Sequence, residues 1–273
     1  MTYFGFLARF LLIPILLFGL LLAIRGRRSS SQPFWSKERA VFVITLHIAI
    51  ALLYTTPWDN YLVATGVWWY DPALVSGLIV GWVPIEEYTF FILQPILTSL
   101  FLLLLLHSRA AESETESGGA STRLAATGVA GVLWLAAVAI LLVGWQPGTY
   151  LGLELGWALP PIMLQLIFGA DILWRYRRPV LLSLLLPTLY LAAADSLAIN
   201  LGVWTIDPAQ SLHLLLLGIL PLEELIFFLL TNTLIVFGVT LSLAPESAQR
   251  FRDVRSRVSA VQNRLTRKMA VEQ

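Results

Sequence analysis

The chain has 273 residues, of which 58% are hydrophobic, with a mean hydropathy of +0.77 and a formal net charge of +1. An apolar share this large, arranged in runs of about 18 or more residues with few charges, indicates a polytopic membrane protein rather than a soluble domain. The sequence contains no cysteine, which excludes disulfides, thiolate metal sites and a cysteine nucleophile.

Seven apolar segments are long enough to cross a bilayer, so we predict an all-α polytopic membrane protein with seven transmembrane helices. The predicted spans are residues 3–24, 40–56, 78–106, 124–143, 150–174, 180–200 and 214–243. We keep the first span as a helix because its apolar stretch is long, contains Arg9 and is not followed by a small-residue cleavage site.

The basic residues predict the orientation. Apart from Arg9, all 18 Lys and Arg residues lie after Pro245 or in the loops that follow the first, third and fifth spans. The positive-inside rule therefore places the N-terminus outside and the C-terminus in the cytoplasm, in an integral protein of a prokaryotic cell membrane. We expect the basic tail, residues 245–273, to meet anionic membrane lipids, and we expect no nucleic-acid partner.

The chain is predicted to consist of two similar halves. The small polar stretch 107–122 is typical of a flexible cytoplasmic linker. "DNYLVATGVWWYDP" (residues 59–72) aligns without gaps to "DSLAINLGVWTIDP" (195–208), and one extra residue then aligns "PIEEYTFF" with "PLEELIFF". We therefore predict a first repeat at 1–106, a connector helix at 123–149 and a second repeat at 150–244, related as two parallel three-helix repeats.

Two pairs of adjacent glutamates stand inside the most apolar segments. An acidic side chain in mid-membrane costs about 2.5–3.5 kcal/mol, so these residues need a compensating environment or a function. The alternative is that they sit at headgroup level and cap helices broken at Pro84 and Pro221. The candidate catalytic residues are Glu86, Glu87, Glu223 and Glu224.

Each of these glutamates shares a helix face with a phenylalanine four residues later. Neighbouring carboxyl groups in an apolar pocket resist ionising together, so an acid and a base can stand side by side. An aromatic face stabilises a desolvated cation by roughly 2 kcal/mol. The candidate substrate-binding residues are therefore Phe90, Phe91, Phe227 and Phe228.

The duplicated Pro-x-Glu-Glu motif, preceded in each half by the Asp-flanked Gly-Val-Trp segment, resembles the small membrane-integral lycopene β-cyclases, here in a form that fuses two subunits. The resemblance covers roughly residues 3–106 and 150–243. It implies lycopene as the substrate and catalytic roles for the four glutamates. It also implies the reaction: a proton adds to the terminal double bond of a ψ end, another double bond captures the tertiary cation, and proton loss leaves a β-ionone ring. Contact with other carotenoid enzymes is a further expectation.

Other residues receive weaker assignments. Asp59 and Asp195 are candidate secondary acids, whereas Asp71 and Asp207 are typical of Asp-Pro turns. Glu154 and Asp171, near the two ends of the fifth span, are expected to be interfacial. Trp68 and Trp204 either bind substrate or belong to an interfacial belt. The three histidines, His47, His107 and His213, have no metal-site spacing, and no dinucleotide-binding glycine motif is present, so no metal and no cofactor are expected.

Four other functions were weighed. A retinal-binding protein needs a membrane lysine, yet the lysines are Lys37 and Lys268, in a loop and the tail. An intramembrane glutamate protease would carry an arginine where Phe91 and Phe228 stand. A proton-coupled transporter suits duplicated halves and buried carboxylates, although the other ends of the third and seventh spans are sealed by apolar residues. A carotenoid hydratase acting through the same cation stays open.

Overall fold

The structure is a computed structural model that describes residues 1–28, 33–107, 119–252 and 255. Most of the predicted linker 107–122, and of the predicted tail 245–273, lies outside the described residues. Within those described, seven helices are long and apolar enough to cross a membrane. The chain is therefore an integral membrane protein, and the predicted number of spans is confirmed.

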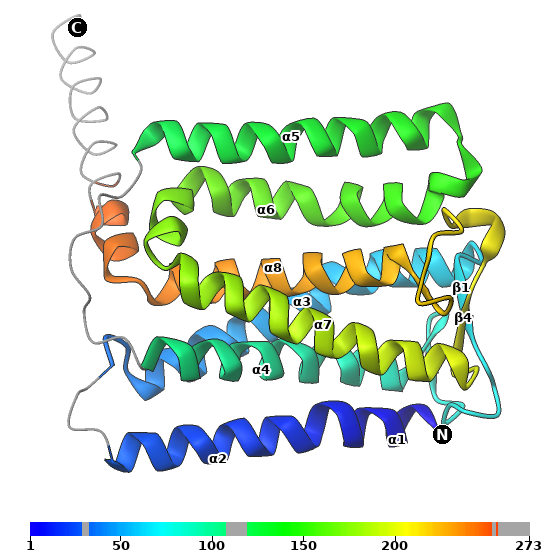
Figure 1. Cartoon of the computed structure of the whole chain (residues 1–273), viewed down its shortest axis with the longest axis horizontal. Coiled ribbons are helices and arrows are strands. Elements are labelled where there is room, and N and C mark those ends of the chain that lie inside the picture. Colours follow the sequence, from blue (N-terminus) through cyan, green and yellow to red (C-terminus); the bar gives the residue numbers. More distant parts are fainter. Residues whose placement is uncertain (29–32, 108–118, 253–254, 256–273) are drawn as a thin grey trace, which may run out of the picture.

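The seven spans run side by side along the long axis of the molecule (Figure 1). A helix satisfies every interior backbone group within its own segment, which is what the bilayer requires of apolar sequences such as these. The first span consists of α1 (Tyr3–Leu7), a π-helical turn (Ala8–Leu12) and α2 (Ile13–Arg28); the others are α3 (Lys37–Ala64), α4 (Ile85–His107), α5 (Ala120–Val143), α6 (Thr149–Arg175), α7 (Arg177–Asn200) and α8 (Leu222–Leu243).

Two helices begin later than predicted. α4 starts at Ile85 and α8 at Leu222, whereas the predicted spans began at residues 78 and 214. The preceding residues instead form two antiparallel hairpins: β2 (Ile79–Val80) with β3 (Val83–Pro84), and β5 (Leu215–Leu216) with β6 (Leu220–Pro221). Both predicted starts were wrong because apolar content alone does not distinguish a membrane helix from an apolar hairpin that leads into one.

Glycine and proline explain these helix starts. Gly81 and Gly218 take positive φ angles, +69° and +75°, which glycine adopts without steric cost. Pro84 and Pro221 directly precede the helices, and a proline disfavours helical geometry in the residue before it. The second span is longer than predicted. Its helix, α3, continues past Pro57 instead of ending at residue 56.

A third ribbon joins the two halves of the chain. β1 (Trp68–Tyr70) pairs antiparallel with β4 (Trp204–Ile206), and Trp69 faces Thr205, its counterpart in the predicted repeat. The flanking bonds are also equivalent: the Asp71 amide donates to the Val203 carbonyl at 3.1 Å, and the Asp207 amide donates to the Val67 carbonyl at 2.8 Å. Equivalent segments that meet in this reciprocal way support two repeats related by an axis along the bundle.

The helices α4 and α8 occupy the centre of the bundle. In the apolar windows of these helices 61% and 56% of residues are buried, compared with 11% for α5, which lies at one edge beside α6 (Figure 1). Side chains of α4 and α8 meet directly: the centroids of the Phe90 and Phe228 rings lie 6.2 Å apart, edge to face, and Gln94 and Thr98 donate to Asn232 at 2.7 and 2.6 Å. The paired glutamates therefore begin the two most enclosed helices.

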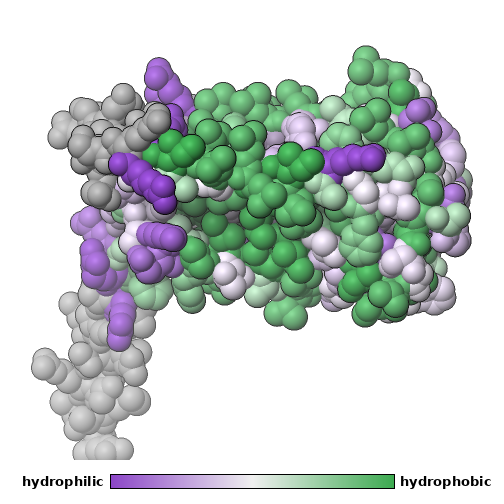
Figure 2. Space-filling view, turned by 90° about the horizontal axis from the view of Figure 1, so that it is seen from below, coloured by the Kyte–Doolittle hydropathy of each residue, from purple (hydrophilic) through white to green (hydrophobic). Residues whose placement is uncertain are grey.

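The two ends of the bundle differ in character. Figure 2 shows an apolar surface along the middle of one face, with strongly hydrophilic residues gathered at the end where α2, α4 and α6 finish. The N-terminus and the β1–β4 ribbon lie at the opposite end (Figure 1). The glutamate motifs thus stand at the ribbon end, away from the basic end.

Candidate active site

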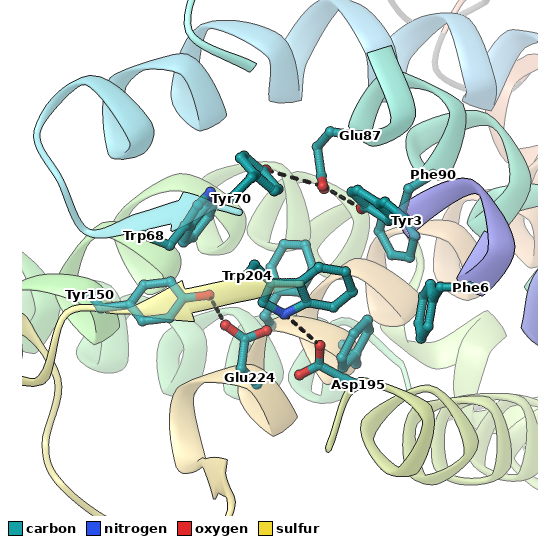
Figure 3. Close-up of a pocket in the computed structure, with 12 residues that line it drawn as sticks. Tyr3, Phe6, Trp68, Tyr70, Glu87, Phe90, Tyr150, Asp195, Trp204 and Glu224 are labelled. Carbon is teal, nitrogen blue, oxygen red and sulfur yellow. Dashed lines mark hydrogen bonds between the residues drawn. The ribbon is translucent and has the colours of Figure 1, made fainter. Parts of the chain in front are cut away.

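A small chamber lies beneath the β1–β4 ribbon, between the N-terminal turns of several helices (Figure 3). Its volume is about 50 Å³, and both halves of the chain contribute to its walls. The lining residues are Tyr3, Phe6, Trp68, Tyr70, Glu87 and Phe90 from the first half, and Tyr150, Asp195, Trp204, Glu224, Phe227 and Phe228 from the second.

The second glutamate of each pair enters this chamber and accepts hydrogen bonds from tyrosines. The hydroxyl of Tyr3, in α1, donates to Glu87, and Tyr70 donates to the same carboxyl at 3.1 Å. In the other half Tyr150, at the start of α6, donates to Glu224 at 2.7 Å. Tyr3 and Tyr150 begin corresponding helices of the two predicted repeats, so each half holds its glutamate in the same way.

The first glutamate of each pair turns toward a loop. Glu86 accepts a hydrogen bond from the backbone amide of Ser76 at 2.6 Å, and Glu223 accepts one from the amide of Leu212 at 2.7 Å. Both side chains are fully buried, and neither lines the chamber. These bonds tie the segment before each hairpin to the helix that follows it. Glu86 and Glu223 therefore contact a loop, whereas their neighbours Glu87 and Glu224 line the chamber.

The two predicted secondary acids are buried near the glutamates. Asp195 lines the chamber and accepts a hydrogen bond from the indole nitrogen of Trp204 at 2.9 Å. Asp59, its counterpart, is only 1% exposed, and neither of its carboxyl oxygens has a hydrogen-bond partner. The duplication is therefore imperfect, because one aspartate faces the cavity and the other is enclosed behind it.

Aromatic rings form most of the chamber wall. Of the four predicted phenylalanines, Phe90, Phe227 and Phe228 line it, while Phe91 lines a neighbouring cavity in mid-membrane. Trp68 and Trp204 also line the chamber, which favours the substrate-facing alternative over an interfacial belt. The centroids of the Tyr3 and Trp204 rings lie 4.9 Å apart in this wall.

The chamber contains carboxyl groups but no cationic side chain among its lining residues. Glu87, Glu224 and Asp195 each accept a hydrogen bond from a neutral phenol or indole donor, so a proton can be gained or lost without breaking an ion pair. Tyr70 lies outside the spans; burial raises its pKa well above the usual range, and the nearby charge of Glu87 adds to this effect. Its phenol therefore stays protonated and able to donate at neutral pH.

Sequence reasoning missed the three tyrosines. Tyr3 and Tyr150 stand at the first residues of corresponding spans, so extending the repeat alignment to those helices would have paired them. No local pattern links either tyrosine to a glutamate many residues away. Tyr70 lies two residues after the Gly-Val-Trp segment, and its counterpart, Ile206, lacks a hydroxyl, so the repeat conceals its role.

Glu154 and Asp171, which are expected to be interfacial, are both buried within the protein. Glu154 is fully buried one turn after Tyr150, and neither of its oxygens has a hydrogen-bond partner. Asp171 is 3% exposed and forms salt bridges with Arg123 at 2.9 Å and Arg250 at 2.5 Å. Position near the end of a span did not predict exposure, because neighbouring segments cover both residues.

The remaining predicted residues lie outside the chamber. Asp71 and Asp207 each accept a hydrogen bond from the amide two residues later, as expected of turn residues. His47 lies within α3, His107 ends α4 and His213 precedes β5. In the part of the chain that the structure describes, no three His, Asp or Glu side chains come together as metal ligands.

Comparisons with known proteins identify the family to which the chain belongs. The model of the lycopene cyclase family matches residues 2–105 and 147–241, two separate segments that together make up most of the chain. This chain belongs to the lycopene cyclase family. The lycopene β-cyclase of Halobacterium salinarum is 38% identical over 244 residues, which cover 88% of this chain and 95% of the relative.

Fungal members of the family are longer. The bifunctional lycopene cyclase/phytoene synthase of Podospora anserina is 37% identical over 199 residues, 70% of this chain but 33% of the fungal protein. Its counterpart in Aspergillus niger is 37% identical over 215 residues, 76% of this chain and 36% of that protein. No solved structure matches the chain.

Proposed function

We propose that this chain is a membrane-integral lycopene β-cyclase, which closes the acyclic ψ ends of lycopene into β-ionone rings without net redox change. One observation carries the proposal: in a member of the lycopene cyclase family, a single aromatic chamber contains two tyrosine-bound glutamates and no cationic lining residue. A nearly full-length relative named lycopene β-cyclase supports the same activity.

The reaction is an isomerisation that begins and ends with a proton transfer. A carboxylic acid gives a proton to the terminal double bond of a ψ end, which leaves a tertiary cation. The next double bond attacks that cation and closes a six-membered ring, moving the positive charge onto the ring. A carboxylate then removes a ring proton, so one proton enters, one leaves and the atoms of the substrate are conserved.

Glu87 and Glu224 are the proposed acid–base pair. Both reach the chamber and are held by phenols rather than by arginine or lysine, so neither is locked in its charged form. Proton transfer by a positioned side chain contributes about 10²–10⁴-fold to a rate. Asp195, which shares the chamber and is bound by Trp204, is a proposed secondary acid.

The chamber walls suit the cation formed between the two proton transfers. A ring face within about 6 Å of a desolvated positive charge stabilises it by roughly 2 kcal/mol, and Phe90, Phe227 and Phe228 offer such faces. At about 50 Å³, the chamber has room for only a few water molecules. Excluding water matters because it would convert the cation to an alcohol.

The first glutamates complete the proposed site from outside the chamber. Glu86 and Glu223 hold the segments before β2 and β5 through short hydrogen bonds to backbone amides, and so fix the helix turns that carry Glu87 and Glu224. We assign them positioning roles. Their direct participation in proton transfer, which their sequence pattern suggested, stays a prediction for mutagenesis.

The proposed setting is a prokaryotic cell membrane that contains dissolved lycopene. The basic loops support cytoplasmic exposure of the end away from the chamber, and so a chamber near the outer face. Membrane lipids surround the spans. Contact with other carotenoid enzymes is also proposed, and the fungal relatives named as bifunctional with phytoene synthase support it.

Expression in a lycopene-accumulating bacterium tests the activity. We expect red acyclic pigment to give way to yellow cyclic carotenoids on chromatography, while a Glu87→Gln/Glu224→Gln double variant of equal membrane abundance leaves the pigment red. Hydroxylated acyclic products would instead support the hydratase, and the ratio of one-ring to two-ring products reports how many ends are cyclised. Ring formation by detergent-solubilised protein, which maintains no ion gradient, would separate an enzyme from a proton-coupled transporter.

A further inference from the structure

A second cavity adjoins the catalytic chamber on the side toward mid-membrane. Its volume is about 200 Å³, and α3, α4, α6 and α8 enclose it. Phe90 and Phe227 line both spaces, so these two rings form the partition between them. The other lining residues are His47, Ile50, Ala51, Tyr54, Thr55, Phe91, Gln94, Pro95, Trp157, Pro161, Gln165, Thr231, Leu234 and Ile235.

This mid-membrane cavity has no charged lining residue, in contrast to the chamber. Three of its polar side chains donate to the protein: Gln94 to Asn232 at 2.7 Å, Gln165 to the Leu234 carbonyl at 3.0 Å, and Thr231 to the Phe227 carbonyl at 2.9 Å. Apolar and aromatic surfaces make up the rest of the wall. A space with these walls suits a hydrocarbon better than a polar ligand.

The mid-membrane cavity reaches the exposed face of α3. Ile50 and Tyr54 line it and are nevertheless 51% and 42% exposed on the outer surface of the bundle. Nearer the chamber, aromatic side chains bridge the two helices: Tyr54 donates to the Trp157 carbonyl at 2.8 Å, and their rings stack at 5.8 Å. A ligand dissolved in the bilayer can therefore enter from the side.

We propose that this mid-membrane cavity is the binding site for the polyene arm of the acyclic carotenoid whose end group occupies the catalytic chamber. The proposal rests on the proposed function, because it takes the substrate to be a long hydrocarbon. The chamber, at about 50 Å³, is smaller than the adjoining space of about 200 Å³, which has no charged lining residue and reaches the exposed face of α3. The chain passes between Phe90 and Phe227, whose rings turn aside to admit it.

Two alanines on α3 provide a matched steric test. Ala51 lines the cavity, whereas Ala49 is exposed on the lipid-facing surface. Ala51→Trp should lower kcat/KM for lycopene by about tenfold or more through overpacking of the cavity, mainly as a higher KM, and Ala49→Trp should leave it within about twofold. Equal kinetics for the two variants, at equal membrane abundance, would overturn the assignment.

Because Ala51→Trp can disturb folding, a second measurement uses smaller substitutions. The chain lacks cysteine, so Ala51→Cys and Ala49→Cys each introduce a single thiol, in a Glu87→Gln/Glu224→Gln background that does not consume substrate. Lycopene added to the solubilised protein should slow maleimide labelling at position 51 several-fold and leave position 49 unchanged. Labelling rates that lycopene does not change at either position would refute the polyene site.

The two measurements also separate this inference from the proposed function. Ring formation by the wild-type protein, together with unprotected labelling at position 51, would leave the cyclase proposal intact and overturn the cavity assignment. Protection by lycopene in a protein that forms no rings would support the site while the proposed activity failed.

Discussion

Buried carboxyl groups occur at both ends of the bundle, and their partners differ. Asp171, near the end of α6, forms salt bridges with Arg123 and Arg250, from α5 and from the segment after α8. Glu87 and Glu224, at the opposite end, accept hydrogen bonds from phenols. An arginine partner holds a carboxylate in its charged form, whereas a phenol lets a carboxyl group change its protonation state. The difference separates a structural tether from groups suited to acid–base chemistry.

The largest effect is expected at the phenol-bound glutamates. Glu87→Gln and Glu224→Gln should each slow ring formation by about 10²–10⁴-fold, because glutamine keeps the size of the side chain but cannot exchange a proton. The rate of cyclic carotenoid formation in isolated membranes measures this, with the exposed Glu38→Gln as the matched control. Wild-type rates for either single variant would remove that glutamate from the acid–base pair.

Substitution of Asp171, the salt-bridged carboxylate, should reduce stability and leave catalysis unchanged. Asp171→Asn should lower the free energy of unfolding by about 1–3 kcal/mol, because two partly buried arginines lose their anionic partner. Thermal unfolding of the solubilised protein measures the change, and Asp71→Asn, in an exposed turn, serves as control. Activity per folded molecule should remain at the wild-type level. Loss of catalysis in folded Asp171→Asn protein would contradict the distinction between the two ends.

Substitutions at Glu86 and Glu223, the first glutamate of each pair, are expected to have a smaller effect on the rate of ring formation. Glutamine at position 86 or 223 can still accept the backbone hydrogen bond, so Glu86→Gln and Glu223→Gln should keep activity within about tenfold of wild type. Glu86→Ala and Glu223→Ala should lose more, because the amides of Ser76 and Leu212 would lose their acceptor. Initial rates of ring formation for the four variants test this difference between glutamine and alanine. A glutamine variant as inactive as Glu87→Gln would restore a direct role in proton transfer.

The smallest effect is expected for Tyr70→Phe, which removes one of two phenol donors to Glu87. The loss of a hydrogen bond of about 0.5–1.5 kcal/mol should lower the rate several-fold. Because burial raises the pKa of Tyr70, the phenol remains protonated through the neutral range, and the ratio of wild-type to variant rates should not change with pH. Rates at several pH values test this, with the exposed Tyr61→Phe as control. A ratio that falls toward unity as pH rises would mean that Tyr70 ionises.

Much of the fold follows from local sequence. Apolar runs of about 20 residues predict membrane helices because the bilayer core has a set thickness, and the seven spans were predicted on that basis. The same reasoning placed the starts of α4 and α8 too early. An apolar hairpin and an apolar helix have the same hydropathy, and only the turn at Gly81 or Gly218 and the proline before each helix distinguish them.

The candidate site, like the fold, was predicted only in part from the sequence. The repeated Pro-x-Glu-Glu-x-x-Phe-Phe motif led to Glu87, Glu224 and three phenylalanines of the chamber wall. Tyr3 and Tyr150 were missed, because their bonds to the glutamates connect positions far apart in the chain. Glu154 was expected at an interface and is buried, because exposure depends on which helices pack around it.

The sequence by itself determined the membrane class, the duplication and the residues able to carry acid–base chemistry, since these depend on residue type, spacing and repetition. Only the tertiary structure decided which glutamate of each pair faces the chamber. Adjacent residues on a helix point about 100° apart, so one member of a pair can face the cavity while the other faces a loop. The direction in which each points is set by the packing of α1, α6 and the β1–β4 ribbon around α4 and α8. That packing brings together groups from both halves of the chain, and no local pattern encodes such contacts.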